Sequence, residues 1–549
     1  MKFPILAALT AISIMGDAAM AEDTAPLDAK DSDPVTLGWM QGFPPAADKT
    51  IRFTDPDFFA FPKLRWTVCH FRELMPTTVV RNGDTAAQDL PSDLDPAINT
   101  VSFTPLGGDA QMTWDEAFDA NYTDGVIVMH KGRIVHERYA GCLDEDTLHG
   151  AMSVTKSITG LLAEVLVAEG KLDENALTGD IIPELHDSGF GDATVRQVLD
   201  MTTALDYSED QSDPNAEFWA YAEAGSPLPK PTGHKGPRSY FDYLQTVEKD
   251  GAHGETFGYR TINADAAGWL VSRVTGLSGA DYLSSRIWSR IGTAREAFYT
   301  VDSIGTPFAG GGFNAILRDM ARLGQLVLQN GEWQGEQVIP AAAIERIREG
   351  GDRDAFAKAG YDLLPGWSYR GMWWVSHDDH GAFTARGVHG QTIWIDPTAE
   401  MVIVRFASNP HAANAANDPT SLPAYRAVAD YLMAQDEAPQ LMGREWLIEY
   451  IGGRGVIDRS PASLLFMPDG QLAGNASCNR LMGSFEAGED GGLSVEPAGT
   501  TMMMCPPALM EQEGRLLAML PEVVSYHIDE TGALMLQTST GETITAHRR

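Results

Sequence analysis

The pattern of apolar residues changes near residues 435–440, and this break is the feature that most limits how the chain can fold. Before it, segments with helix-like and strand-like hydrophobic periods follow one another. After it, residues 446–549 consist of short apolar runs separated by glycine turns. A chain of 549 residues has room for two to four domains of roughly 150 residues each. We therefore expect a large domain at 111–436 and a separate small domain at 441–549.

Both kinds of secondary structure are predicted in the large domain. Val126–Met129 and Arg133–His136 flank a Lys-Gly pair, which is typical of a β-hairpin. From Ser153 to Gly170 the apolar residues recur with a period near 3.6, which predicts a helix. Similar signals predict helices at 264–274 and 317–328 and a pair of strands across 391–406.

The N-terminus has the pattern of an export signal. Lys2 precedes an apolar run from Phe3 to Met15, and Ala19-Met20-Ala21 is a small-x-small cleavage pattern. We expect a signal peptide at 1–21 and a periplasmic or secreted mature protein. An uncleaved anchor helix is the alternative, but the run is short for a span of about 20 residues. No later stretch of the sequence is long and uncharged enough to span a membrane. Residues 22–110 are expected to form a tail and an arm packed on the large domain.

The formal net charge of −36 disfavours nucleic acids and anionic membrane surfaces as partners. Export makes disulfides chemically possible for the four cysteines. Cys478 and Cys505 both lie in the C-terminal segment and are the most natural pair. Cys69 and Cys142 could form a second pair or remain free buried thiols.

The first candidate for chemistry is the S-x-x-K tetrad formed by Ser153 and Lys156 at the start of a predicted helix. Residues three apart share one face of a helix, so the amine can reach the hydroxyl. The positive potential of a helix N-terminus depresses the pKa of a lysine, and a neutral lysine can activate a serine. By itself the tetrad is weak, because it more often marks a helix start that a serine caps.

Two later segments strengthen this hypothesis. Tyr259 and Thr261 form a Y-x-T element, and His389-Gly390 follows Gly387-Val388. With these elements in order, the chain resembles the β-lactamase-related serine hydrolases, the class C β-lactamase-like superfamily, and within it the 6-aminohexanoate-dimer hydrolase-like branch. That superfamily combines S-x-x-K with Y-x-N or Y-x-S and with K-T-G or H-x-G. The likeness covers about residues 37–435, including the stretches at 65–77 and 205–210.

The resemblance implies an α+β, β-lactamase/transpeptidase-like fold, in which helices flank an antiparallel sheet and a helical subdomain is added. It also implies that Ser153 attacks a carbonyl to form an acyl-enzyme, with Lys156 and Tyr259 sharing the work of the base. A phenol held near an ammonium is expected to have a lowered pKa. No cofactor or metal is expected for this chemistry.

The remaining roles concern substrate and oxyanion. The N–H of Ser153 and a second N–H near Gln391, on the strand after His389-Gly390, are expected to form the oxyanion hole. Thr261 is expected to orient Lys156 or the substrate through its hydroxyl. Tyr207 lies in a loop that resembles a substrate-contacting loop of the family, although simple packing would explain it equally well.

Two departures from the β-lactamase pattern bear on the substrate. Thr261 stands where β-lactamases usually have Asn, and His389 stands where they have the Lys that helps to bind the substrate carboxylate. Both favour small esters or amides. A D-Ala-D-Ala-type peptidase or β-lactamase and a non-catalytic envelope binding protein are the alternatives. Each residue also has a purely structural explanation. Tyr259 could be a half-buried aromatic side chain, and His389 could be a turn residue with a local hydrogen bond.

Two further motifs are interpreted as structural. Trp373-Trp374 is expected to fill a sheet core rather than a pocket wall. His377 and His380 flank two aspartates, but residues so close in sequence rarely converge on one metal ion, so a polar hairpin turn is preferred.

The C-terminal segment at 446–546 resembles the META domain, a small exported module of bacterial envelope proteins. The matching residues are Trp446, Gly474, Ser477–Arg480, Gly483, Thr500–Cys505, Glu511 and Leu516. The resemblance implies a structural or binding role, with an envelope protein as a possible partner. A copper site at Met502–Met504 is conceivable, but methionine more often fills a core.

Overall fold

The computed structural model describes residues 25–548 except 84–86, 212, 438–440, 458–459, 461, 489–490 and 530. The predicted signal peptide at 1–21 lies outside the described residues. The chain divides into two compact units, the first ending at Asp430 and the second beginning at Tyr431. In the part of the chain described, no helix has the length and apolar character needed to cross a membrane.

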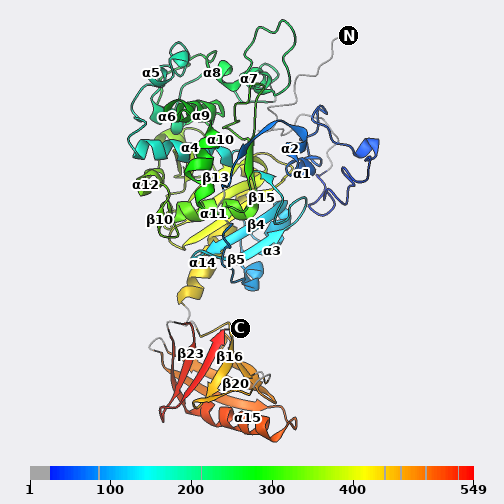
Figure 1. Cartoon of the computed structure of the whole chain (residues 1–549), viewed down its shortest axis with the longest axis vertical. Coiled ribbons are helices and arrows are strands. Elements are labelled where there is room, and N and C mark those ends of the chain that lie inside the picture. The colour runs from blue at the N-terminus through cyan, green and yellow to red at the C-terminus, as the bar shows by residue number, and fades with distance from the viewer. Residues whose placement is uncertain are drawn as a thin grey trace. The chain divides into compact units, whose positions relative to one another are not determined.

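A seven-stranded antiparallel sheet forms the centre of the first unit (Figure 1). The predicted hairpin is confirmed as β4 (Thr123–His130) and β5 (Arg133–Tyr139). Its turn residues Lys131 and Gly132 both have positive φ, 49° and 76°, as a two-residue hairpin loop requires. In order across the sheet the strands are β11 (Ser368–Arg370), β12 (Trp373–Val375), β13 (Phe383–Gly387), β14 (Gln391–Asp396), β15 (Met401–Ala407), β4 and β5.

Helices cover both faces of the sheet, and the side chains along each strand point alternately toward one helical layer and the other. Helix α11 (Leu317–Leu328) packs so closely that a Cβ added to Gly324 would lie 2.6 Å from Val402 and 3.2 Å from Ile393. Trp394 points the other way, and its ring lies 5.5 Å from that of Tyr425 on α14 (Asp418–Glu437). Within the two central strands, Ile393–Ile395 and Met401–Val404 are therefore apolar at successive positions, as a sheet covered on both sides requires.

Several helices of the first unit gather beyond one end of this sheet, whereas the helix at 114–120 lies beside β4 and β5 (Figure 1). Helix α4 (Val154–Ala168) begins one residue after Ser153, and α9 (Ile262–Thr275) ends at Gly276, which has φ 71°. The remaining helices are α1 (Leu64–Thr67), α2 (Phe71–Leu74), α3 (Trp114–Ala120), α5 (Thr178–Ile181), α6 (Val195–Leu199), α7 (Glu217–Gly225), α8 (Tyr240–Leu244), α10 (Gly279–Arg286), α12 (Ala341–Glu349) and α13 (Arg353–Ala357).

A small four-stranded sheet connects the N-terminal arm to the start of α4. Its order is β1 (Thr77–Val80), β7 (Ala297–Thr300), β8 (Phe313–Ala315) and β6 (His149–Gly150). The arm is fixed by buried Arg65, whose guanidinium lies 3.1 Å from Asp124 and donates to the hydroxyl of Ser32 at 2.9 Å. The disulfide between Cys69 and Cys142 adds a covalent link close by.

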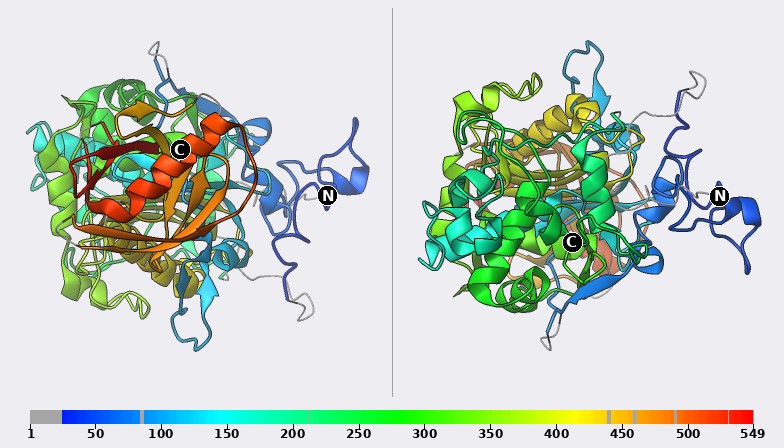
Figure 2. Two further views of the ribbon diagram at one scale, coloured as in Figure 1. Left: turned by 90° about the horizontal axis from the view of Figure 1, so that it is seen from below. Right: turned by 90° about the horizontal axis from the view of Figure 1, so that it is seen from above.

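The second unit is one strongly curved antiparallel sheet with a single long helix, α15 (Pro507–Met519), lying across it (Figure 2). Its two edge strands approach each other through a bridge between Gly492 and Ser525. Apolar side chains from both elements, among them Trp446 and Leu516, form its core. The strands are β16 (Glu445–Ile451), β17 (Arg454–Gly455), β18 (Ala462–Phe466), β19 (Gln471–Ala476), β20 (Arg480–Ala487), β21 (Leu493–Thr500), β22 (Val523–Ile528), β23 (Leu534–Thr538) and β24 (Thr543–Arg548).

The disulfide between Cys478 and Cys505 joins the turn before β20 to the segment before α15, across 27 residues. Replacing both cysteines with alanine is expected to destabilise this unit by about 3 kcal/mol, because the unfolded chain regains the entropy of an open loop. Hydrogen exchange of β18–β20 in the full-length chain measures the effect. The Cys69→Ala/Cys142→Ala protein is the control, since its lost constraint lies in the first unit. Equal protection of β18–β20 in all three proteins would contradict the prediction.

Candidate active site

The chain turns sharply just before Ser153. Met152 is buried and has φ 46°, a left-handed conformation that costs a non-glycine residue roughly 1–2 kcal/mol. Ser153 then stands at the N-cap of α4, yet its side chain forms no capping hydrogen bond. The structure therefore does not support the alternative that Ser153 merely caps a helix, because its hydroxyl is left for another partner.

That partner is Lys156, one turn along the same helix. Its ammonium donates to Ser153 Oγ at 2.8 Å and to the carbonyl oxygen of Gly310 at 2.7 Å. The side chain is 1% exposed, and burial lowers the pKa of Lys156 to about 8, against the opposing charges of Glu209 and Asp265. An appreciable fraction of Lys156 is thus neutral near neutral pH, which is the state in which an amine can accept the proton of the serine.

Tyr259 contacts both members of this pair. Its ring centroid is 5.0 Å from Lys156 Nζ, and its phenol is within hydrogen-bonding reach of Ser153. Burial raises the pKa of Tyr259, so the expectation of a lowered pKa beside the lysine is wrong. The desolvation of the phenolate outweighs the hydrogen bond to Ser153. Tyr259 is therefore a protonated phenol at rest, and Lys156 is the better base.

Of the two roles expected for the Thr261 hydroxyl, to orient Lys156 or the substrate, the structure does not support the first. Its backbone N–H and its hydroxyl both donate to the carboxylate of Glu209. Burial raises the pKa of Glu209, while Lys156 and the bonds to Thr261 oppose this. Thr261 thus fixes a carboxylate that faces the amine of Lys156. Sequence reasoning placed Glu209 in a family-like stretch but gave it no role.

A second acid faces Lys156 from α9. Asp265 is buried and accepts a hydrogen bond of 2.6 Å from the hydroxyl of Tyr221. Burial raises the pKa of Asp265 to about 7, against the hydrogen bond from Tyr221 and the charge of Lys156. Two acids with raised pKa values therefore lie near one lysine with a lowered pKa, a pattern that is concentrated in functional sites.

The carbonyl that holds Lys156 belongs to a glycine loop at 310–312. A Cβ added to Gly310 would lie 2.3 Å from Cγ2 of Thr261, so no other residue fits without displacement. Three consecutive glycines stand here in the sequence, but nothing in it shows that they contact the lysine. Every residue carries a main-chain carbonyl oxygen, so only the requirement for glycine at this position can be seen in the sequence.

The end of β13 contacts the turn that carries Ser153. A Cβ added to Gly387 would lie 2.8 Å from the carbonyl oxygen of Ala151 and 3.0 Å from the N–H nitrogen of Ser153. The backbone at this strand end thus approaches the first amide of the nucleophile turn. Gln391 pairs with Gly387 across the hairpin, and its side-chain amide donates to the carbonyl of Ala407 at 2.7 Å. The side chain of Gln391 is therefore hydrogen-bonded within the sheet.

The expected substrate role of His389 needs correction. The ring is 1% exposed, packs edge-on against Phe59, and its Nδ1 lies 2.7 Å from the carbonyl oxygen of Asn409. Burial lowers the pKa of His389 to about 4, so it is neutral and cannot replace the positive charge of a lysine. The adjacent Gly390, with φ 98°, accepts a hydrogen bond of 2.9 Å from Arg405 at its carbonyl. Both residues shape the turn between β13 and β14.

Two other predictions concern aromatic side chains. Tyr207 is 6% exposed and packs against Tyr221 and Tyr243, so it lies in an aromatic cluster rather than on a surface open to substrate. Trp373 and Trp374 are buried, as expected for a sheet core, but the Trp374 ring is also only 5.5 Å from Tyr259.

The two histidines at 377 and 380 do not share a site. His377 contacts Ser368 at 2.7 Å, whereas His380 contacts Asp396 at 2.7 Å. In the described ranges, the one group with metal-ligand geometry is Cys69, Cys142 and His149. The disulfide between these cysteines removes both thiolates, so this group does not suit a metal ion.

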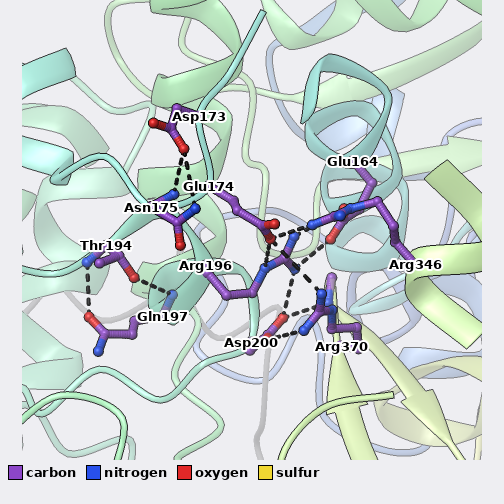
Figure 3. A network of polar contacts seen from close by, with 11 residues as sticks. Glu164, Asp173, Glu174, Asn175, Thr194, Arg196, Gln197, Asp200, Arg346 and Arg370 are labelled. Carbon is purple, nitrogen blue, oxygen red and sulfur yellow. Dashed lines mark hydrogen bonds and ion pairs between the residues drawn. The ribbon is translucent and has the colours of Figure 1, made fainter. Parts of the chain in front are cut away.

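A buried ionic network holds α4 in place (Figure 3). The carboxylate of Glu164, two turns beyond Lys156, is fully buried and contacts Arg196 at 2.5 Å and Arg346 at 3.1 Å. Arg196 also lies 2.7 Å from Glu174 and 3.0 Å from Asp200. The network joins α4, α6 and α12, and each buried acid has a guanidinium partner.

Replacing Arg196 with methionine is expected to lower the free energy of unfolding of the first unit by about 3 kcal/mol. The substitution removes the nearest cation of buried Glu164 and leaves Arg346 at 3.1 Å as its remaining partner in the network, and loss of one partner from a buried ionic network is strongly destabilising. Urea unfolding measures the change. Arg426→Met is the matched control, since its pairs with Asp379 and Asp430 are largely exposed and contribute at most about 1 kcal/mol. Equal losses in the two variants would contradict the prediction.

Comparison with known proteins agrees with this geometry. The β-lactamase family model matches residues 116–424, more than half of the chain, and the META domain model matches residues 439–549. The 6-aminohexanoate-dimer hydrolase of Paenarthrobacter ureafaciens is 32% identical over 350 residues, 64% of this chain and 86% of the relative. A solved structure from Bacillus anthracis, assigned as a 6-aminohexanoate-dimer hydrolase, is 32% identical with a TM-score of 0.63. It covers 71% of this chain and 99% of its own.

The fold and the site thus define a hydrolase of the β-lactamase type. The chain belongs to the β-lactamase family, is related within it to the 6-aminohexanoate-dimer hydrolases, and carries a C-terminal META domain.

Proposed function

We propose that this protein is an exported serine hydrolase that cleaves small esters or amides through an acyl-enzyme on Ser153. The observation that carries the proposal is the 2.8 Å hydrogen bond between Lys156 Nζ and an uncapped, nearly buried Ser153 Oγ. An oriented nucleophile and base at this distance are the arrangement that covalent catalysis needs.

The proposed acylation starts with neutral Lys156 accepting the proton of Ser153 while Oγ attacks the substrate carbonyl. The N–H of Ser153 and a second N–H near Gln391, which pairs with Gly387 beside the Ser153 turn, stabilise the oxyanion. Tyr259, protonated and beside Oγ, donates its proton to the leaving group, and the Lys156 ammonium returns a proton to it. Water then hydrolyses the ester on Ser153 by the same groups acting in reverse.

The surroundings of His389 argue against β-lactams as substrates. A β-lactam carries a carboxylate, for which the buried, neutral His389 offers no positive charge. The relatives named as 6-aminohexanoate-dimer hydrolases support linear amides as one substrate class.

A substrate panel tests the proposed function. Purified protein starting at Glu22 would be assayed with 6-aminohexanoate dimer, p-nitrophenyl butyrate and nitrocefin, with Ser153→Ala as the control. The proposal expects turnover of the ester or the amide that Ser153→Ala abolishes. Nitrocefin as the fastest substrate would identify a β-lactamase instead. An absence of Ser153-dependent turnover on all three would favour a binding protein.

Export is the second part of the proposal. The pattern at residues 1–21 and the two disulfides, which persist mainly in oxidising compartments, support it. N-terminal sequencing of the protein from cell fractions is the test. A chain that begins at Glu22 in the periplasm or medium agrees with export, and a cytoplasmic chain that retains residues 1–21 contradicts it.

A further inference from the structure

A methionine-rich segment leads into α15 of the META domain, and its backbone is firmly held. Thr501 donates from its hydroxyl to Asn479 Oδ1 at 2.8 Å, and Met503 donates from its N–H to the same oxygen at 2.6 Å. Cys505 is joined to Cys478 by the disulfide. Every second residue of the segment is therefore fixed to 478–480.

The residues between these attachment points project into solvent. Met502 is 99% exposed and Met504 is 97% exposed, whereas Met503 between them is 56% exposed. The expectation that these methionines fill a core is wrong. Burying a methionine side chain normally stabilises a protein by roughly 1.5–3 kcal/mol, and two neighbouring positions forgo this. Because the backbone is held at 501, 503 and 505, this exposure is not the fraying of a loose loop.

Met502 and Met504 are two positions apart, and both lie almost fully in solvent. Their Cα atoms are at most roughly 7 Å apart, a distance that two side chains with three rotatable bonds each can close to bring both sulfurs onto one small ligand. The feature that separates this pair from ordinary exposed apolar residues is the thioether. Thioethers are soft donors that select copper(I) over the harder divalent ions.

We propose that Met502 and Met504 form a surface site for a soft monovalent metal ion, copper(I), presented by the segment that the disulfide and Asn479 hold. The four cysteines are all in disulfides, so they provide no competing thiolate. The site is far along the chain from Ser153 and is independent of hydrolysis. A neutral pair of thioethers holds the ion weakly enough to release it again, in contrast to a thiolate site.

Two titrations of the full mature chain test the site. Silver nitrate in chloride-free buffer serves as a redox-inert mimic and is followed by calorimetry. Copper(I) is measured anaerobically by competition with bicinchoninate, with ascorbate as the reductant. The test variant is Met502→Leu/Met504→Leu, which keeps volume and apolarity but removes both sulfurs. The control is Met482→Leu/Met510→Leu, which removes two other exposed methionines of the same domain.

The proposal predicts one equivalent of metal on the parent and on the control, with affinity at least about tenfold weaker in Met502→Leu/Met504→Leu. X-ray absorption of the copper-loaded parent should show sulfur ligands. No binding by the parent, or equal affinity in both variants, would overturn the proposal. Circular dichroism of the variants verifies that the domain remains folded.

Discussion

Replacing Lys156 with alanine is expected to slow acylation of Ser153 by about 10⁴-fold, the upper range for loss of a general base. The amine lies 2.8 Å from the serine oxygen, and the other neighbour of that oxygen, Tyr259, has a pKa raised by burial and does not accept a proton readily. Glu209 and Asp265 face the amine, whereas Lys156 and Tyr259 are the groups bonded to the serine hydroxyl in the described part of the chain. The rate of inactivation by a serine-directed fluorophosphonate, measured with excess reagent, reports acylation without requiring the natural substrate.

Lys171→Ala is the matched control for this experiment. Lys171 follows the same helix, but its ammonium is largely exposed and pairs with Glu169 at 2.7 Å. Its removal should leave the inactivation rate within about twofold, because screened surface pairs contribute little. A loss below tenfold in Lys156→Ala would mean that another group serves as the base.

The pH dependence of acylation should follow Lys156. Because burial lowers the pKa of Lys156 to about 8 from the usual 10.5, the neutral amine gains population as pH rises through about 8. We expect the inactivation rate to rise with pH and to level off above that value. The same depressed pKa makes the unfolded chain bind more protons than the folded chain between about pH 8 and 10.5, so its contribution to stability increases across this window. A rate that is flat from pH 6 to 9 would contradict the assignment.

Replacing Gly160 with alanine is expected to destabilise the first unit by about 3 kcal/mol, the upper range for overpacking. Gly160 lies on α4 one turn after Lys156, and a Cβ added there would be 2.0 Å from the carbonyl oxygen of Gly371. Backbone cannot rotate away as a side chain can, so the helix must shift. A shift of about 1 Å at the nucleophile would lower the acylation rate by roughly 10²-fold as well.

Gly279→Ala provides the comparison for the helix glycine. Gly279 is the first residue of α10, and a Cβ added there meets no heavy atom within 4 Å. That substitution should leave stability unchanged or raise it slightly, since alanine restricts the unfolded chain. Urea unfolding and the fluorophosphonate rate together separate the two variants. Unchanged values in Gly160→Ala would show that α4 is not seated on Gly371 as described.

Local patterns predicted the elements that carry the site. The hairpin of β4 and β5 and the helix at 317–328 follow from hydrophobic period and turn residues, which act between near neighbours. Ser153, Lys156 and Tyr259 were predicted because their spacing matches a mechanism and a family pattern, and the structure brings the three together.

Features that depend on distant backbone could not be predicted in the same way. The Gly310 carbonyl on Lys156 and the Gly371 carbonyl against Gly160 join segments more than a hundred residues apart, and a carbonyl has no residue type of its own. The protonation state of Tyr259 was predicted wrongly because burial, which the sequence does not display, outweighs the nearby ammonium. The same applies to His389, whose ring is enclosed by Phe59 from the N-terminal arm.

The central claim is that Ser153 is the nucleophile, and peptide mass spectrometry after fluorophosphonate labelling tests it most directly. The mature protein, Ser153→Ala and Ser157→Ala would be labelled side by side, since Ser157 is a buried serine on the same helix whose hydroxyl donates to the carbonyl of Met372 at 2.6 Å. The account predicts a single adduct on Ser153 in the parent and in Ser157→Ala, and none in Ser153→Ala. Equal labelling of Ser153→Ala would contradict it.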